Sequence, residues 1–217
     1  MVFKRKLYPE EMKIIERIVD FVKDKHHRAE GHDYSHVLEV CRLSIEIARK
    51  VKDPVDPFVL MCGALLHDIG RINAPNGLFH GLDGAARANE LLKSYIDDEK
   101  LSRQIQQIIV SHTPESMVIP RTPEEKVVFD ADTIERLGFM GMVRGLMGKS
   151  GTMGDIIEDR IHKRLQDYSK LFYPVSRKFA KKAYKETIAV SKTLRKDLVR
   201  RANEIHEISS YSLIKEE

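Results

Sequence analysis

The sequence predicts an all-α protein, and three observations support this fold class. Apolar residues recur at the i, i+3, i+4, i+7 spacing of an amphipathic helix in the periodic segments. No segment shows the strict apolar–polar alternation that is typical of a half-buried strand. Proline and capping residues stand where several segments begin. We therefore expect residues 1–217 to form a single helical domain, with a core at about 20–150 and a C-terminal helical extension at about 155–210.

The first three predicted helices differ in how much of their surface is apolar. The first begins at Pro9 and has one apolar side, and the second begins at about Tyr34 and carries a regular apolar stripe. The third follows the cap-and-proline pair at Asp56 and runs from Phe58 to about Ile69, where Gly70 is expected to end it. Because this third helix is apolar on nearly all sides, we expect it at the centre of a bundle.

The next helices are separated by polar segments. A loop at residues 71–82 is rich in Asn, Pro and Gly, and Asp83 is expected to cap the helix that follows as far as Tyr95. Another helix is expected from Asp98 to Ser111. Thr122, followed by proline and two glutamates, forms a capping box that begins a further helix.

Residues 138–154 have an unusual composition. They contain six of the twelve glycines and four of the eight methionines of the chain. Glycine raises backbone freedom and methionine packs adaptably, so one interpretation is a mobile lid over a ligand. The other interpretation is a pair of short helices whose glycines allow close packing. Two or three long charged helices are expected after this segment.

Composition bears on the location of the protein. No apolar run approaches the roughly 20 residues that a membrane-spanning helix needs, and the N-terminal residues lack the apolar stretch of a signal peptide. Cys41 and Cys62 both lie in apolar helical patterns and are expected to be reduced. We therefore expect a cytoplasmic protein that does not enter a membrane.

Charge is unevenly distributed along the chain. Residues 160–201 carry a net charge of +11, whereas the rest of the chain carries −7. Such asymmetry favours a phosphate-bearing ligand, an acidic partner or a surface for homodimer formation. Nucleic-acid binding through this segment stays open, because aromatic residues alternate with its basic ones: Phe172, Tyr173, Phe179 and Tyr184. The favoured alternative is a solvated helical face whose aromatic residues turn toward the core.

Four polar residues occur where the apolar pattern predicts burial. His36 borders the stripe of the second helix, His67 and Asp68 end the most apolar helix, and Asp132 adjoins Ala131 one turn after another apolar position. Any one of them alone is more often a core or capping residue. Together they suggest a shared divalent cation, because a buried carboxylate costs several kcal/mol unless it is paired or binds metal.

The order of these motifs resembles a known family. HDYSHVLEV, ALLHDIG, IIVSHT and DADTIERLGFMGMVRG together resemble the HD-domain superfamily, over about residues 20–150. The resemblance implies an all-helical fold and a metal-dependent phosphohydrolase that often acts on nucleotides. By matched position, it also implies four metal ligands: His36, His67, Asp68 and Asp132.

Further candidate residues are less certain in role. His80 and His112 resemble the extra ligands of two-metal members, so each is expected to bind a second metal or a substrate phosphate, or to be a loop or helix-end residue. Arg71 and Arg144 are candidates for phosphate contacts, with surface salt bridges as the alternative. Single-metal nucleotidases of the superfamily commonly carry an acidic residue a turn after the HD pair, which this chain lacks. Asp33 and Asp83 are therefore the nearby carboxylate candidates for the catalytic acid or base. A helix N-cap is the alternative for each, and it is favoured for Asp83.

The remaining histidines are assigned from their surroundings. His26, His27 and His162 are expected at the surface, whereas His32 is close enough in sequence to His36 to orient the site. Asp130 is expected to point roughly opposite Asp132 on the same helix.

The expected chemistry is attack of metal-activated water on phosphorus. Mixed N and O ligands suit Mn²⁺, Fe²⁺, Co²⁺ or Mg²⁺, with one site expected and a second considered. The expected partner is a small phosphorylated substrate, with a nucleotide favoured. Two other functions are considered: a di-iron HD-type oxygenase, and a non-catalytic, metal-stabilised module that binds nucleic acid.

Overall fold

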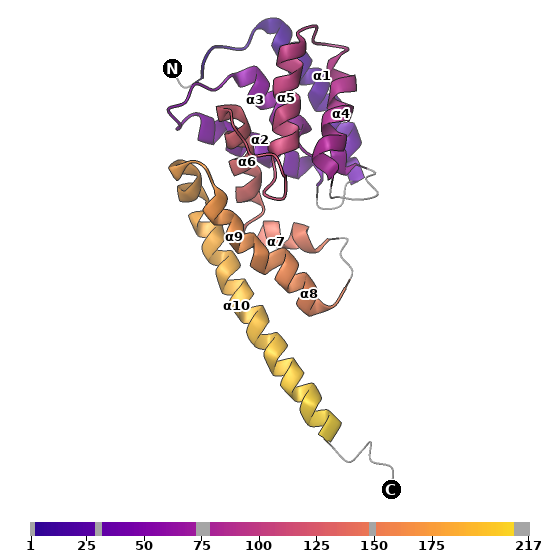
Figure 1. Cartoon of the computed structure of the whole chain (residues 1–217), viewed down its shortest axis with the longest axis vertical. Helices are drawn as coiled ribbons and strands as arrows, with labels where there is room; N and C mark the ends of the chain where they lie inside the picture. Colours follow the sequence, from indigo (N-terminus) through magenta and orange to yellow (C-terminus); the bar gives the residue numbers. More distant parts are fainter. Residues whose placement is uncertain (1–2, 29–31, 73–78, 148–150, 211–217) are drawn as a thin grey trace.

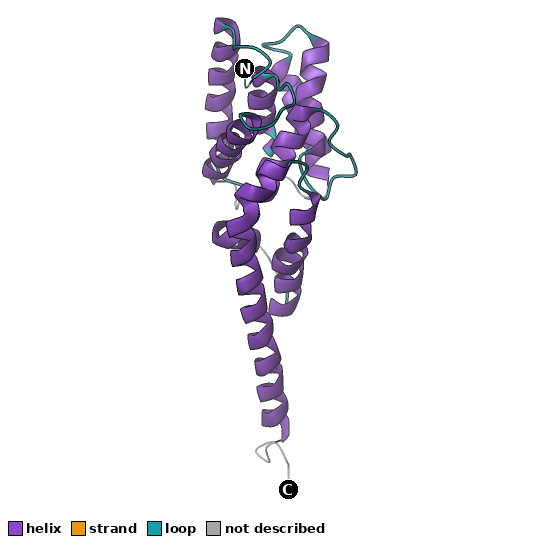
Figure 2. Cartoon of the chain, turned by 90° about the vertical axis from the view of Figure 1, so that its left-hand side faces the viewer, coloured by secondary structure: helices purple, strands orange, loops and turns teal. Residues whose placement is uncertain are grey.

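A computed structural model describes residues 3–28, 32–72, 79–147 and 151–210, apart from the side chains of 28, 160 and 206–210. The described residues form helices and connecting loops without a β-strand (Figure 2), which confirms the predicted all-α class. The helices in chain order are α1 (Pro9–Lys25), α2 (Tyr34–Ala48), α3 (Pro57–Leu66), α4 (His80–Leu92), α5 (Glu99–Ser111), α6 (Pro123–Glu135), α7 (Gly138–Leu146), α8 (Met153–Ile157), α9 (Lys163–Lys170) and α10 (Pro174–Ser210).

Helix α3 lies at the centre of the bundle, as its apolar surface predicts. It packs against α1, α2, α5 and α6, and Phe58, Leu60, Leu65 and Leu66 are almost completely buried. Asp56 caps the helix, because its carboxylate accepts hydrogen bonds from the backbone of Phe58 at 3.0 Å and of its neighbour at 3.3 Å. Helices α1, α2, α5 and α6 therefore surround α3.

Helix α3 ends at Leu66, earlier than its apolar pattern predicts, so that His67 and Asp68 follow its last turn. We expected Gly70 to cap α3, and this prediction is wrong. Gly70 instead lies in a short 3₁₀ helix, η2 (Ile69–Arg71). A Cβ atom at Gly70 would lie 1.9 Å from the carbonyl oxygen of His80. Gly70 is therefore required by the close approach of α4, which brings His80 beside the end of α3.

Helix α4 begins three residues earlier than predicted. His80 is its first residue, so the prediction that Asp83 caps the helix is wrong. Asp83 instead lies exposed in the first turn, where a negative charge interacts favourably with the helix dipole. Residues 73–78 of the predicted loop lie outside the described part of the chain.

The glycine-rich segment forms two short helices, α7 and α8, which is one of its two predicted interpretations. Two of its glycines have a structural reason. Gly138 has a φ of +75°, which favours glycine, and a Cβ atom at Gly141 would lie 2.3 Å from the backbone of Arg136. Residues 148–150 lie outside the described part, and motion of the segment as a lid stays a prediction.

The C-terminal part consists of α9 and the long α10, with a π-helical turn, η4 (Glu158–His162), before them. Figure 1 shows α10 running alongside α9 and α7 and then continuing beyond them. Tyr173, Phe179 and Tyr184 pack against the core, and the ring of Phe172 lies 5.2 Å from that of Phe129. The prediction that these aromatic side chains turn inward is confirmed.

Among the described residues, every helix is too short or too polar to cross a membrane.

Candidate metal centre

Six buried histidine and aspartate side chains converge where five helices end or begin. The four residues matched to the superfamily motif come from α2, the turn after α3, and α6, and they are joined by one residue from the start of α4 and one from the end of α5. Each is at most 6% exposed. The six residues are His36, His67, Asp68, His80, His112 and Asp132.

The first group of donors consists of His36, His67 and Asp132. Their nearest donor atoms all lie within 4.8 Å of one another. The Nε2 atoms of His36 and His67 are 3.2 Å apart, and His36 Nε2 lies 3.5 Å from Asp132 Oδ1. Asp68 adjoins this group, because its Oδ2 lies 3.4 Å from the Nε2 atoms of both histidines. The structure thus brings together the four residues that the sequence singled out.

The second group consists of Asp68, His80 and His112, whose donor atoms also lie within 4.8 Å of one another. The two histidine Nε2 atoms are 3.4 Å apart, and His112 Nε2 lies 3.4 Å from Asp68 Oδ1. Asp68 therefore turns one carboxylate oxygen toward each group.

Backbone carbonyls fix the orientation of two of these imidazoles. The Nδ1–H of His67 donates to the carbonyl of Ala64 at 2.8 Å, and that of His112 donates to the carbonyl of Ile109 at 2.7 Å. A neutral imidazole with a proton on Nδ1 presents a lone pair at Nε2. The lone pairs of both histidines therefore point into the cluster, as metal ligands require.

The electrostatic balance keeps both carboxylates ionised. Burial favours the neutral form of Asp68, but the neighbouring His32 and His67 outweigh it and hold the pKa of Asp68 well below its usual value. Burial acts in the same way on Asp132, whose pKa is lowered overall by His36 and His67. Two buried anions thus face a small space lined by imidazoles.

The two imidazoles of the first group differ in their protonation. Burial lowers the pKa of His67 and favours its neutral form. Burial also acts to lower the pKa of His36, but its contacts with Asp68 and Glu135 outweigh this effect and raise the pKa to about 9. The carboxylates that stabilise a proton on His36 would equally stabilise a cation at its Nε2. The donor set, with two carboxylates and four imidazoles, is able to hold a divalent metal ion.

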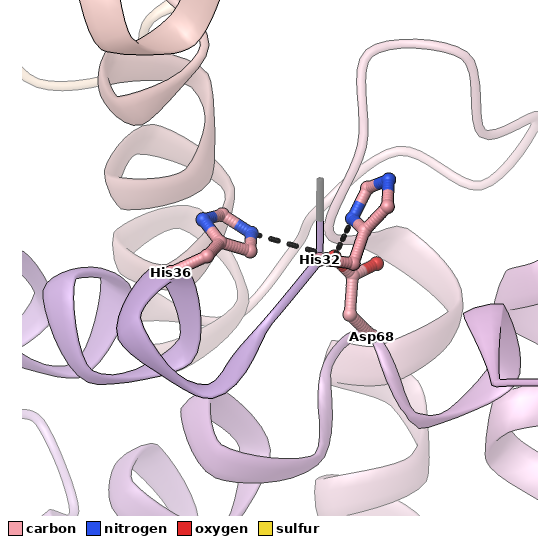
Figure 3. A group of neighbouring side chains, drawn as sticks. All are labelled: His32, His36 and Asp68. Atoms are coloured by element: carbon pink, nitrogen blue, oxygen red, sulfur yellow. Dashed lines mark hydrogen bonds and ion pairs between the residues drawn. The ribbon is translucent and has the colours of Figure 1, made fainter. Parts of the chain in front are cut away.

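His32 is an additional residue at this site, with a more direct contact than its sequence position alone indicates. Its Nδ1–H donates to Asp68 Oδ2 at 2.6 Å, and Figure 3 shows the rings of His32 and His36 both directed toward this carboxylate. The backbone carbonyl of His32 in turn accepts a hydrogen bond from His26 Nδ1 at 2.6 Å. His26 is completely buried, so its predicted surface position is wrong. The HxxxH spacing of His32 and His36 was the available signal.

Glu135 is a residue that the sequence analysis missed. Its Oε2 lies 3.4 Å from His36 Nδ1, on the side of the ring that faces away from the donor cluster. The same oxygen forms an ion pair with Arg144 of α7. Glu135 follows Asp132 by three positions, about one helical turn, so it lies on the same face of α6. This periodicity was the signal for a supporting carboxylate.

The two arginines predicted to contact phosphate and the predicted catalytic acid, Asp33, lie at three different positions relative to the donor groups. Arg71 Nε lies 3.6 Å from Asp68 Oδ1, beside the second group. Arg144 forms the salt bridge that we considered as its alternative role, and thereby supports His36 through Glu135. Asp33 is exposed and caps α2, accepting a hydrogen bond from the backbone of His36 at 3.1 Å. The capping alternative for Asp33 is thus observed, and its catalytic role stays a prediction.

Asp130 points away from the cluster, as expected from its position relative to Asp132. It is completely buried, and it accepts hydrogen bonds from the backbone of Phe172 at 2.8 Å and of Tyr173 at 3.0 Å. Burial raises the pKa of Asp130 to about 6, although these hydrogen bonds act in the opposite direction. Asp130 therefore anchors the beginning of α10.

The motif and the geometry agree with the comparison of the chain with known proteins. Residues 33–137 match the family model of the HD domain. The chain contains an HD domain of the HD superfamily. This match confirms the predicted resemblance, and the matched range includes every residue of the two donor groups.

Solved structures share the fold over most of the chain. A predicted HD superfamily hydrolase from an uncultured Thermotogales bacterium is 25% identical, with a TM-score of 0.55, over 87% of this chain and 91% of that one. Bacillus subtilis YpgQ, solved in complex with ADP, is 22% identical, with a TM-score of 0.66, over 87% and 96%. The protein therefore has the fold of HD-superfamily hydrolases and a His/Asp cluster able to hold a metal ion.

A curated relative matches a shorter part of the HD protein. It is the tRNA (cytidine(56)-2'-O)-methyltransferase of Picrophilus torridus, which is 30% identical in an alignment of 128 residues that covers 52% of this chain. The chain spans about a third of the length of that relative, since the match covers 34% of it.

Proposed function

We propose that this HD protein is a metal-dependent phosphohydrolase that acts on a small phosphorylated molecule. The observation that carries the proposal is the sharing of Asp68 between two groups of donors, His36–His67–Asp132 and His80–His112. A divalent cation there would supply a Lewis acid for phosphoryl oxygens and would lower the pKa of a water molecule. The chain's own residues supply a buried, preorganised set of ligands.

The residues around the donors have distinct proposed roles. His67 and His112 are held by backbone carbonyls, so their imidazoles do not reorganise when a cation binds. Arg71, beside Asp68, is placed to contact a phosphate oxygen with its guanidinium. His32 orients Asp68 and, with its side chain 32% exposed, lies where the cluster meets solvent. Arg71 and His32 are thus the proposed residues at the edge of the buried site, where substrate would bind.

We favour a nucleotide as the substrate. YpgQ, which shares the fold, was solved in complex with the nucleotide ADP. The Picrophilus torridus relative acts on tRNA, according to its name, which supports a connection with nucleic-acid metabolism for this chain too.

The two cysteines are buried and free, in keeping with the proposed cytoplasmic location. Association as a homodimer stays a prediction.

The direct test is a phosphate-release screen with the metal-free protein. Nucleoside mono-, di- and triphosphates and sugar phosphates would each be incubated with Mn²⁺, Co²⁺, Mg²⁺ or Fe²⁺. We expect phosphate or pyrophosphate release from a nucleotide with at least one of these metals. Absence of release from every substrate, with metal shown to be bound, would contradict the proposal.

The sharing of Asp68 also fits a second function, a di-iron HD-type oxygenase. An anaerobic iron titration followed by spectroscopy separates the two. Coupled iron together with oxygen consumption would support the oxygenase, whereas hydrolysis supported by redox-inert Mg²⁺ would support the phosphohydrolase.

A further inference from the structure

Helix α10 carries a line of lysines along one face. With about 100° of rotation per residue, five lysines lie within about 40° of a common line. At about 1.5 Å per residue, the line from Lys178 to Lys196 is about 27 Å long. We call it the lysine face, and its members are Lys178, Lys182, Lys185, Lys192 and Lys196.

The lysine face is exposed and has little neutralising charge. All five lysines are exposed to solvent. Within the described part of the chain, the ion pair found for them is Lys182 with Glu186, at 3.9 Å. The other acidic residues of α10 whose side chains the structure describes, Asp197 and Glu204, pair with Arg200. The lysine face therefore presents a nearly uniform positive charge to solvent.

The packing of α10 does not depend on the lysine face. The buried residues of the helix lie on its opposite side, where Ala180, Thr187 and Ser191 are at most 3% exposed. Leu194 packs there against a small cluster that includes Ile161. Lysines three and four positions apart repel one another and destabilise a helix by a few tenths of a kcal/mol per pair. A bound polyanion would remove this repulsion.

We propose that the lysine face binds the phosphate backbone of nucleic acid, in addition to the hydrolase site and independently of it. A nucleic-acid strand places a charge about every 3.4 Å in a helix. The lysines are spaced by about 4.5–6 Å along α10, apart from a gap of about 10.5 Å between Lys185 and Lys192, so each of them can contact a phosphate. The aromatic side chains of α10 turn toward the core, so bases have no stacking surface on this face. The contact is therefore to the backbone and independent of sequence.

The composition of the lysine face favours nucleic acid over a lipid surface. Helices that lie on membranes combine a basic face with large apolar residues such as Trp, Phe or Leu that enter the lipid. Between Lys178 and Lys196, the apolar residue near the line is Ala189, which is too small for that role. A basic helix face without large apolar residues beside it favours a polyanion over a lipid surface as the ligand.

The test is binding of labelled tRNA and of duplex DNA to the full chain, measured by fluorescence anisotropy over a range of salt concentrations. Two variants are compared. The first changes the five lysines of the lysine face to Gln. The second is a control with the same loss of charge, in which five exposed lysines of the HD domain become Gln: Lys13, Lys23, Lys50, Lys93 and Lys100. Circular dichroism before and after heating verifies that both variants are folded.

The expected result is salt-dependent binding by the wild type that the first variant weakens at least about tenfold at low salt. For duplex DNA, the slope of log K against log salt concentration should fall by about 4.5, or about 0.9 for each of the five lost phosphate contacts. The control should lose less than about threefold. Absence of binding by the wild type, or equal losses in the two variants, would overturn the proposal. So would tighter binding to vesicles of anionic lipid than to RNA.

Discussion

The donor cluster of the HD domain and the lysine face of α10 are both regions of concentrated charge, but they are built in opposite ways. The cluster is buried, its charges have opposite signs, and its residues come from five helices. The lysine face is exposed, has one sign, and comes from a single helix. The fold must hold the cluster together, whereas α10 needs only its opposite side for packing.

This difference determines what a substitution can reveal. Removing one member of a buried ionic cluster leaves its partners without compensation, so both chemistry and stability respond. Removing an exposed charge changes the surrounding potential and hardly affects the fold. The variants below test this contrast, from the largest expected effect to the smallest.

Replacing Asp68 with Ala should have the largest effect. Asp68 contributes an oxygen to each donor group, so we expect the variant to lose both metal retention and phosphohydrolase activity. Elemental analysis after gel filtration and the phosphate-release assay measure the two losses. Asp97→Ala, at an exposed position, is the control. Metal retention by the Asp68 variant would contradict the shared role of this carboxylate.

Replacing His80 with Ala should affect one donor group. The variant keeps His36, His67, Asp68 and Asp132, so we expect it to retain metal in the first group and to lose it from the second. Metal content by elemental analysis, compared with that of the wild type, reports this partial loss. If the metal content of the variant equalled that of the wild type, His80 would be excluded as a ligand.

Replacing Glu135 with Gln should weaken metal binding without abolishing it. The carboxylate faces Nδ1 of His36 at 3.4 Å, and substitution of such outer partners typically costs about 10- to 100-fold in metal affinity. Competition with a fluorescent chelator measures the change. Glu90→Gln, at an exposed position, should leave the affinity unchanged. An equal loss in both variants would mean that general charge, rather than the contact with His36, is responsible.

Replacing Asp130 with Asn should lower stability but leave metal binding intact. The amide can accept one of the two backbone hydrogen bonds from Phe172 and Tyr173, so the loss is about 1–3 kcal/mol in the free energy of unfolding. Urea denaturation measures it. Asp132→Asn, two positions along α6, should lose metal binding, because it removes a charged member of the donor cluster. If Asp130→Asn lost metal binding to the same extent as Asp132→Asn, the purely structural role of Asp130 would be contradicted.

Replacing Arg195 with Gln should have the smallest effect. Arg195 forms an ion pair with Glu158 at 2.8 Å, but both side chains are about half exposed, and exposed pairs contribute little. We expect no measurable change in the urea midpoint at physiological ionic strength. A clear loss of stability would show that α10 depends on its surface charges, contrary to the contrast drawn above.

Much of the fold and of the cluster could be predicted from the sequence, because burial of polar residues is costly. His67 and Asp68 follow a helix that is apolar all round, and Asp132 adjoins buried apolar positions, so their convergence was expected. The start of α4 was not, because the contact between Gly70 and His80 joins residues whose proximity no local pattern encodes.

The supporting residues were harder to predict for a related reason. His26 resembles a surface histidine in its polar segment, and its burial depends on the hydrogen bond with the backbone of His32. Glu135 resembles an ordinary charged residue near the end of a helix until His36 and Arg144 are brought against it by α2 and α7. Tertiary contacts, rather than spacing, determine these roles.

The division of one carboxylate between two groups of donors has a thermodynamic consequence. Occupancy of one group would orient Asp68 for the other and would also place a second dication nearby, so the two binding equilibria would be coupled with equal strength in both directions. The metal that filled one position would therefore influence which metal the other prefers. Mixed-metal preparations of this protein should have affinities that neither metal shows alone.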